Sequence, residues 1–143
     1  MKMNKSLLSA SVDIEVPFHD CDPMRVVWHG NYARYFEVAR CRLLDKFDAG
    51  YVSMEKLGYM WPIIDLQVKY IGSARFGQVI EVTAHLLEYE SRLKIGYEIH
   101  DKLTGQRLTK GSTVQVAVEI ASQEMQFTTP QPLIDKLSQV ITL

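Results

Sequence analysis

Cysteine is scarce in this chain, since only Cys21 and Cys41 occur in 143 residues. They form no CxxC pair and have no zinc-ligand spacing, and two cysteines cannot build the disulfide framework of a small secreted domain. The first ten residues, MKMNKSLLSA, contain an apolar run that is too short for a signal peptide. We therefore expect a reduced, cytoplasmic protein.

Long apolar runs and an excess of one charge are also missing. No stretch of the chain approaches the ~20 apolar residues that a membrane-spanning helix needs. Lys and Arg number 16 and Asp and Glu number 17, for a net charge of −1, which predicts neither a nucleic-acid nor a membrane partner. Hydrophobic residues make up 47%, enough for a packed core in a single domain over residues 1–143.

Alternation of apolar and polar residues predicts five strands. The turn sequence DKLTGQ, with Gly105, predicts a hairpin between the last two. The apolar faces are Val12, Ile14, Val16 and Phe18 within residues 11–18; Ile64, Leu66, Val68 and Tyr70; Ile80, Val82, Ala84 and Leu86; Leu93, Ile95, Tyr97 and Ile99; and Val114, Val116, Val118 and Ile120.

One long helix is predicted between the first two strands. Asn31 is a favoured N-cap residue, and the helix should end near Phe47, before Gly50. A short helical turn is expected over residues 53–58, and a short helix or tail over 130–140 with Leu133, Ile134 and Leu137 inward. This order predicts an α+β fold, an antiparallel five-stranded sheet wrapped around the long helix. The apolar stripe of that helix is Tyr32, Tyr35, Phe36, Ala39, Leu43 and Phe47.

The segment HDCDPMRVVWHGNY, residues 19–32, concentrates titratable side chains directly before the helix. Free N–H groups at a helix N-terminus favour developing negative charge, and a nearby carboxylate can act as base or nucleophile. Turn chemistry is the alternative interpretation, because Asp22-Pro23 starts turns and Asn31 caps helices.

Two further interpretations of the segment are weaker. A metal site from His19, Asp20, Cys21, Asp22 and His29 is hard to build, because consecutive extended residues point to opposite faces. Spacing fixes no base beside Cys21, which argues against a cysteine nucleophile, and Cys41 should be structural.

The stretch CDPMRVVWHGNY resembles the signature of hot-dog-fold acyl-CoA thioesterases of the 4-hydroxybenzoyl-CoA thioesterase type, and looks closest to the branch with the Tol-Pal-associated thioesterases. NYARYFEVAR resembles the helix of that family, and WPIIDLQVKYIGSARFGQVIEV resembles its following strands. The resemblance covers nearly the whole chain. The matching positions are Cys21, Asp22, Arg25, Val26, Val27, His29 and Tyr32.

The resemblance implies hydrolysis of acyl thioesters, from CoA or acyl carrier protein, without a metal or organic cofactor. It implies that Asp22 attacks the thioester carbonyl or activates water, and that backbone N–H groups at residues 29–31, Asn31 included, polarise the carbonyl. We expect the His29 side chain to assist. The resemblance also implies a homo-oligomer, a dimer or homotetramer, with active sites at subunit interfaces.

Substrate-binding residues follow from the same resemblance. Trp61 and Pro62 align with positions that line the acyl pocket, and Tyr32 and Phe36 would line its helix side; for Trp61, core packing is the alternative. Ser73 and Arg75 are candidates for the CoA phosphates, since Arg suits phosphate geometry, although a solvated hairpin tip is the slightly favoured interpretation. His85 and His100 are expected at the surface.

Two other functions remain open. A hydroxyacyl-thioester dehydratase shares the fold but carries a His-Phe-Pro type motif, which HGNY lacks. In a non-catalytic acyl-thioester-binding or scaffold protein, Asp22 would serve only as a turn residue.

Overall fold

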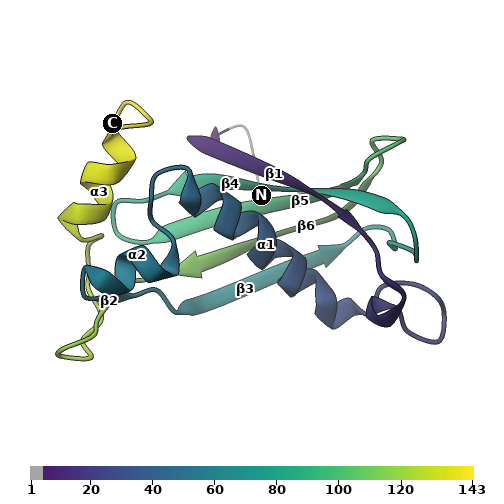
Figure 1. Ribbon diagram of the computed structural model, residues 1–143, viewed down its shortest axis with the longest axis horizontal. Helices are drawn as coiled ribbons and strands as arrows, with labels where there is room; N and C mark the ends of the chain where they lie inside the picture. Colours follow the sequence, from purple (N-terminus) through teal and green to yellow (C-terminus); the bar gives the residue numbers. More distant parts are fainter. Residues whose placement is uncertain (1–4) are drawn as a thin grey trace.

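The computed structural model describes residues 5–143, and its main feature is one antiparallel sheet with a long helix along one face (Figure 1). The strands lie in the order β1-β4-β5-β6-β3, which confirms the α+β fold and the five strands. In chain order the elements are β1 (Leu8–Glu15), the short 3-10 helices η2 (Phe18–Asp20) and η3 (His29–Asn31), α1 (Tyr32–Asp45), α2 (Tyr51–Lys56), β2 (Tyr59–Met60), β3 (Ile63–Tyr70), β4 (Val79–Glu88), β5 (Leu93–Asp101), β6 (Arg107–Gln115), β7 (Val118–Glu119) and α3 (Gln131–Ser138).

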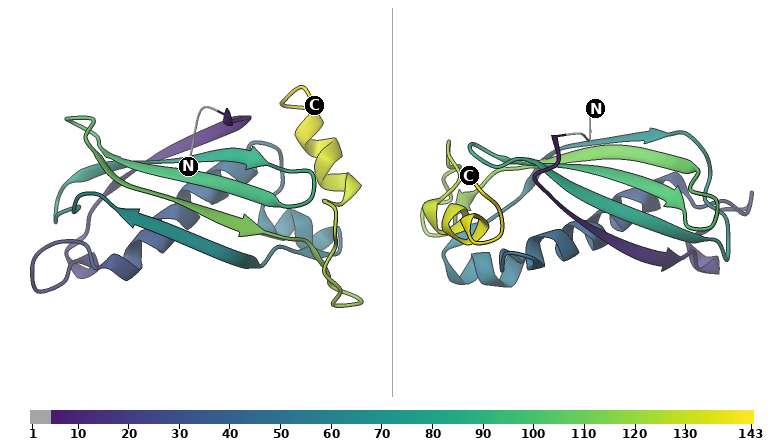
Figure 2. Two further views of the ribbon diagram at one scale, coloured as in Figure 1. Left: turned by 180° about the vertical axis from the view of Figure 1, so that it is seen from behind. Right: turned by 90° about the horizontal axis from the view of Figure 1, so that it is seen from above.

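The core lies between α1 and the inner face of the curved sheet, and Figure 2 shows that none of the helices in residues 5–143 covers the outer face. The predicted inner faces of β4 and β5 are confirmed, because their apolar side chains are all at most 1% exposed. Each large apolar side chain removed from water contributes roughly 1.5–3 kcal/mol. The predicted stripe of α1, from Tyr32 to Phe47, is buried against them.

A close contact between α1 and β6 depends on a glycine. The Phe36 ring stacks on Tyr97, with centroids 4.3 Å apart, and it also lies over Gly111. A Cβ at position 111 would come within 2.6 Å of the Phe36 ring and 2.4 Å of the Gln67 carbonyl oxygen. Phe36 is 0% exposed and belongs to the core, and its predicted place in a substrate pocket stays a prediction.

Two predicted strands differ from the observed ones at their ends. The chain leaves β1 after Glu15 and turns into η2, so that Phe18 is 74% exposed instead of facing inward with Val16. The last predicted run is interrupted after Gln115, and Val118 pairs with Met60 in a separate two-stranded sheet.

The predicted helices are present with shifted boundaries. The long helix ends at Asp45, and turns carry the chain to Gly50. The short helix α2 begins at Tyr51, ahead of the predicted start at Ser53. The C-terminal segment forms α3, with Leu133 and Leu137 buried and Ile134 only half-buried.

Strand β3 is an edge strand with exposed apolar side chains. Ile64, Leu66 and Tyr70 are 58%, 46% and 50% exposed, because α1 does not extend over this edge of the sheet. Along residues 5–143, no helix has both the length and the apolar character needed to cross a membrane.

Candidate active site

The segment between β1 and α1 forms a tight loop that holds Asp22 in place. The Asp22 N–H donates to the Val26 carbonyl, and the Arg25 N–H donates to the Asp22 carbonyl, each over 2.9 Å. Arg25 has a φ of 66°, a conformation that non-glycine residues adopt mainly in turns. The Val27 N–H donates to the Ala74 carbonyl and thereby ties the loop to the segment before β4.

The two carboxylate oxygens of Asp22 have different environments. Oδ1 accepts the Met24 N–H over 2.9 Å, the bond expected of an aspartate that starts a turn. The other oxygen has no hydrogen-bond or ion-pair partner in residues 5–143. The half-buried side chain borders two cavities of about 310 and 380 Å³. The turn and catalytic interpretations are therefore compatible, since one oxygen fixes the loop and the other has no partner among the described residues.

The 310 Å³ cavity brings Asp22 together with three predicted site residues, His29, Tyr32 and Ser73. Tyr70, which was not predicted as a site residue, also lines it. The Tyr70 hydroxyl donates to the His29 carbonyl over 2.8 Å, and the two rings meet edge to face. The buried Tyr32 hydroxyl accepts the Ala74 N–H, and burial raises the pKa of Tyr32, so this phenol stays neutral.

The start of the helix differs from the capping prediction. Asn31 occupies the N-cap position, but its side chain makes no cap bond and instead donates to the Asp20 carbonyl over 2.9 Å. The Asn31 backbone N–H donates to the Trp28 carbonyl and is therefore also occupied. The N–H groups of His29 and Gly30 have no acceptor among the described residues.

Gly30 permits the local packing at this point. The Trp28 indole lies against it so closely that a Cβ at position 30 would come within 2.2 Å of the ring. This arrangement keeps the backbone before α1 in place, next to His29 and Tyr32.

Asp20 has a structural role, although the sequence pattern puts it two residues from Asp22. It is 3% exposed, accepts the Tyr35 hydroxyl over 2.6 Å and forms an ion pair with Arg34. Burial raises the pKa of Asp20, but these two contacts outweigh burial and hold it below its ordinary value. Asp20 is the last residue of the η2 turn and contacts Tyr35, whereas Asp22 follows the turn and accepts the Met24 N–H, so the two aspartates have different surroundings.

Ser73 and Arg75 lie next to the Asp22 cavity. Ser73 lines both this cavity and a neighbouring one of about 610 Å³, whose wall includes Arg75 and Gln78. The backbone N–H of Arg75 donates to the side-chain oxygen of Gln78 over 2.9 Å, while the Arg75 side chain is exposed. The two predicted CoA-binding residues therefore share the 610 Å³ cavity, which adjoins the Asp22 cavity at Ser73.

Trp61 and Pro62 are placed elsewhere. They precede β3 at the end of the strand opposite to Tyr70, so within one protomer they do not line the Asp22 cavity. Trp61 is 6% exposed and borders a separate cavity of about 340 Å³, whereas Pro62 is exposed.

The described residues contain no group of three or more His, Cys, Asp or Glu side chains suited to a metal ion. The half-buried Cys21 lines the 380 Å³ cavity, and its thiol points to the Pro17 carbonyl over 3.7 Å. Cys41 is half-buried on α1, and burial raises the pKa of its thiol. Neither cysteine is disulfide-bonded.

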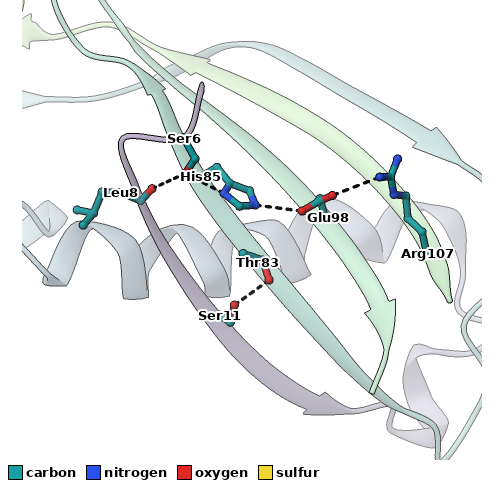
Figure 3. Close-up of polar contacts among 7 residues, drawn as sticks. All are labelled: Ser6, Leu8, Ser11, Thr83, His85, Glu98 and Arg107. Atoms are coloured by element: carbon teal, nitrogen blue, oxygen red, sulfur yellow. Dashed lines mark hydrogen bonds and ion pairs between the residues drawn. The ribbon is translucent and has the colours of Figure 1, made fainter. Parts of the chain in front are cut away.

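His85 is not the simple surface residue that its polar strand face predicts. Its ring lies between the Ser6 hydroxyl, 2.9 Å from Nδ1, and the Glu98 carboxylate, 3.0 Å from Nε2 (Figure 3). Arg107 extends this network from β6. The side chain is 15% exposed, because neighbouring strands on the outer face cover it.

Tyr70 is the site residue that sequence reasoning missed as a functional candidate. The alternation of β3 assigned it to the inner face, and it is the last residue of the strand, three positions before Ser73. That position at a strand end beside a predicted binding residue was the available signal.

Comparison with known proteins gives a consistent family. The model of the "Thioesterase-like superfamily" matches residues 16–138. "Putative acyl-CoA thioesterase YneP" of Bacillus subtilis is 28% identical over 108 residues, which cover 75% of this chain and 78% of that protein.

Two solved structures extend the similarity to the fold. The DHNA-CoA thioesterase of Staphylococcus aureus is 32% identical with a TM-score of 0.75, covering 82% of this chain and 78% of that one. Hypothetical protein TT1821 of Thermus thermophilus is 30% identical with a TM-score of 0.81, covering 92% of this chain and 98% of that one.

Proposed function

Because the chain belongs to the Thioesterase-like superfamily, we propose that it hydrolyses acyl-CoA thioesters with Asp22 as the catalytic carboxylate. The hot-dog fold and hydrolysis of acyl thioesters are the fold and the activity of this chain, in line with its acyl-CoA thioesterase relatives. The observation that carries the assignment to Asp22 is its carboxylate, which has one oxygen without a partner among the described residues and whose side chain borders a cavity that His29 and Tyr70 also line.

The reaction can begin in either of two ways. The free oxygen of Asp22 can attack the thioester carbon to form an acyl-aspartyl anhydride, which water then hydrolyses. Alternatively it can accept a proton from a water molecule whose oxygen attacks that carbon. Either route consumes one water, breaks the carbon–sulfur bond and yields the free acid and the thiol.

The oxygen of the thioester carbonyl becomes negative during the attack, and backbone N–H groups are well suited to stabilise it. The N–H groups of His29 and Gly30 are available for this, because they have no acceptor among the described residues. They lie in η3, directly before the N-terminus of α1, where the helix dipole also favours negative charge. The exposed His29 ring, which packs against Tyr70, would orient the substrate or water.

The CoA moiety would occupy the neighbouring 610 Å³ cavity. Arg75 would pair with a CoA phosphate, since a guanidinium makes strong, directional bonds to phosphate oxygens, and Ser73 would add a hydroxyl donor. With CoA as the thiol, we place the reaction in the cytoplasm, which agrees with two cysteines that are not disulfide-bonded.

We further propose that the enzyme is a homo-oligomer assembled through β3. An exposed apolar edge strand is unusual in a monomer, because it can pair with other chains, and Ile64, Leu66 and Tyr70 would be buried by such pairing. Two β3 edges that pair antiparallel about a twofold axis bring the Tyr70 end of one strand next to the Ile63 end of the other. Two such dimers could associate further into a homotetramer.

The test is hydrolysis by the wild-type protein over a panel of short, long and aromatic acyl-CoAs, with matched acyl carrier protein thioesters alongside. Thiol release would be measured and corrected for Cys21 and Cys41. We expect release from CoA thioesters to exceed release from the carrier-protein series. Formation of an enoyl product would instead identify a dehydratase, and tight binding without thiol release would identify a binding protein.

A further inference from the structure

The outer face of β3 carries three polar residues that the proposed chemistry does not use. Asp65, Gln67 and Lys69 alternate with Leu66 and Val68 of the other face, and the Gln67 amide donates to Asp65 Oδ2 over 3.3 Å. Asp65 and Lys69 are exposed, and neither forms an ion pair with any of residues 5–143. The strand therefore presents an unpaired acid toward one end and an unpaired base toward the other.

Lys69 has an unfavourable neighbour within its own protomer. It lies directly opposite Lys110 of β6 in the strand register, and like charges in directly opposed positions destabilise a strand pair. The next residue in this row, across β5, is Glu98, but its carboxylate is already engaged by His85 and Arg107 (Figure 3). A carboxylate placed on the open side of β3, next to Lys69, would offset the repulsion between the two lysines.

The open side of β3 is where such a carboxylate can come from. The strand has β6 on one side and no strand of the described chain on the other (Figure 1). An edge strand keeps unpaired backbone N–H and C=O groups along its open side, and these can pair with a second strand. If that strand is β3 of another copy, the twofold axis is perpendicular to the sheet, and directly opposed residues keep their side chains on the same face. The outer-face residues of the two copies then meet one another.

Only one register of this pairing brings the opposite charges together. With the axis at Gln67, Asp65 lies opposite Lys69 of the partner subunit, and by symmetry Lys69 lies opposite the partner's Asp65. An axis at Leu66 or Val68 places both charged residues opposite uncharged ones. An axis at Asp65 or Lys69 places two identical charges directly opposite each other, which is unfavourable. The charge pattern of β3 is therefore complementary to itself in a single register.

We propose that Asp65 and Lys69 recognise each other between two copies of this chain and fix the register of β3 self-pairing at Gln67. The inference rests on the homo-oligomer of the proposed function and defines its interface. In this register Ile64 of the partner subunit lies opposite Tyr70, which lines the 310 Å³ cavity, so the register decides which part of the second copy borders the site. Charged residues across an interface contribute more to partner choice than to affinity, so this pattern favours a second copy of the same chain.

The test mixes two charge-reversal variants, Asp65→Lys and Lys69→Asp, whose folding is checked by circular dichroism. A homodimer of either variant opposes like charges at both contacts, whereas a mixed dimer opposes unlike charges at both. After subunit exchange, native mass spectrometry gives the amounts of the three dimers. Random exchange makes the mixed dimer about twice as abundant as each homodimer, whereas we expect an excess of about 10-fold or more at low ionic strength, which shrinks as salt is added.

Glu90→Lys is the matched control, because it makes the same change of charge as Asp65→Lys at an exposed position outside β3. Mixed with Lys69→Asp it should give random proportions, since the favourable and unfavourable contacts then balance between mixed and homodimers. The double variant Asp65→Lys/Lys69→Asp should dimerise like the wild-type protein.

Random proportions of Asp65→Lys and Lys69→Asp would overturn the inference, as would a folded double variant that fails to dimerise or a wild-type protein that sediments only as a monomer. Thiol release by the wild-type protein is measured separately. Failure of the thioesterase proposal and failure of the register therefore give different results.

Discussion

Replacement of Asp20 by Asn should destabilise the protein without removing its chemistry. Asn matches the shape of Asp but carries no charge, so it loses the ion pair with Arg34 and the charged bond from the Tyr35 hydroxyl. Its amide nitrogen would also face one of these two donors. Hydrogen bonds to a charged group contribute about 1.5–3 kcal/mol each, but Arg34 is 51% exposed and solvent screens its share. We expect a loss of about 1–3 kcal/mol in the free energy of unfolding at neutral pH.

The pH dependence of that loss is a sharper test. Because the pKa of Asp20 is held below its ordinary value of 3.8 in the folded protein, its stabilisation is complete above that value and fades as the pH falls further. The difference between wild type and Asp20→Asn should therefore be full at pH 7 and shrink progressively below pH 3.8.

The assay is urea unfolding followed by circular dichroism, at one fixed protein concentration because assembly contributes to stability. Asp135→Asn is the matched control, since Asp135 is exposed on α3 and should give no comparable loss. Equal stability of Asp20→Asn and wild type at pH 7, or a difference that stays constant through the acid range, would refute this reasoning.

Three further changes test other parts of the account. His29→Ala should lower turnover moderately while the fold is kept, with His100→Ala as control; wild-type turnover would leave only a backbone role for residue 29. Leu66→Asp should shift sedimentation toward the monomer and reduce activity, whereas Leu103→Asp, at a 96% exposed position, should do neither. Gly111→Ala should cost about 1–3 kcal/mol in unfolding free energy because its Cβ meets Phe36 and the Gln67 carbonyl, while Gly50→Ala, with one contact at 3.1 Å, should cost far less.

Sequence patterns correctly predicted the strands whose apolar faces are buried by other elements of the same chain. The alternation in β4 and β5 was read correctly because the inner faces of both strands are buried in the core of the same chain. The same reasoning failed for Phe18, where the chain turns into η2, and for His85, whose burial depends on residues from three other segments. For β3 the alternation is present, but Ile64, Leu66 and Tyr70 on that face stay 46–58% exposed in the described part of the chain.

In the site, too, the local sequence pattern identified a residue, whereas contacts between residues distant in sequence could not be predicted. The resemblance singled out Asp22, and the structure leaves one of its oxygens free. Spacing alone could not separate Asp22 from Asp20, because an extended chain would put both on one face and only the η2 turn directs Asp20 inward to Tyr35. The capping prediction for Asn31 failed because a residue distant in sequence, Asp20, takes its side chain.

Turnover of Asp22→Asn is the most direct test of the central claim. Asn keeps an oxygen to accept the Met24 N–H, so the loop should hold, and only the charge and the basic oxygen are lost. With a preferred acyl-CoA, we expect kcat to fall ~100-fold or more while KM, circular dichroism and sedimentation stay near wild type. Asp135→Asn should be fully active. Wild-type turnover by a correctly folded Asp22→Asn would contradict the assignment of Asp22 as the catalytic carboxylate.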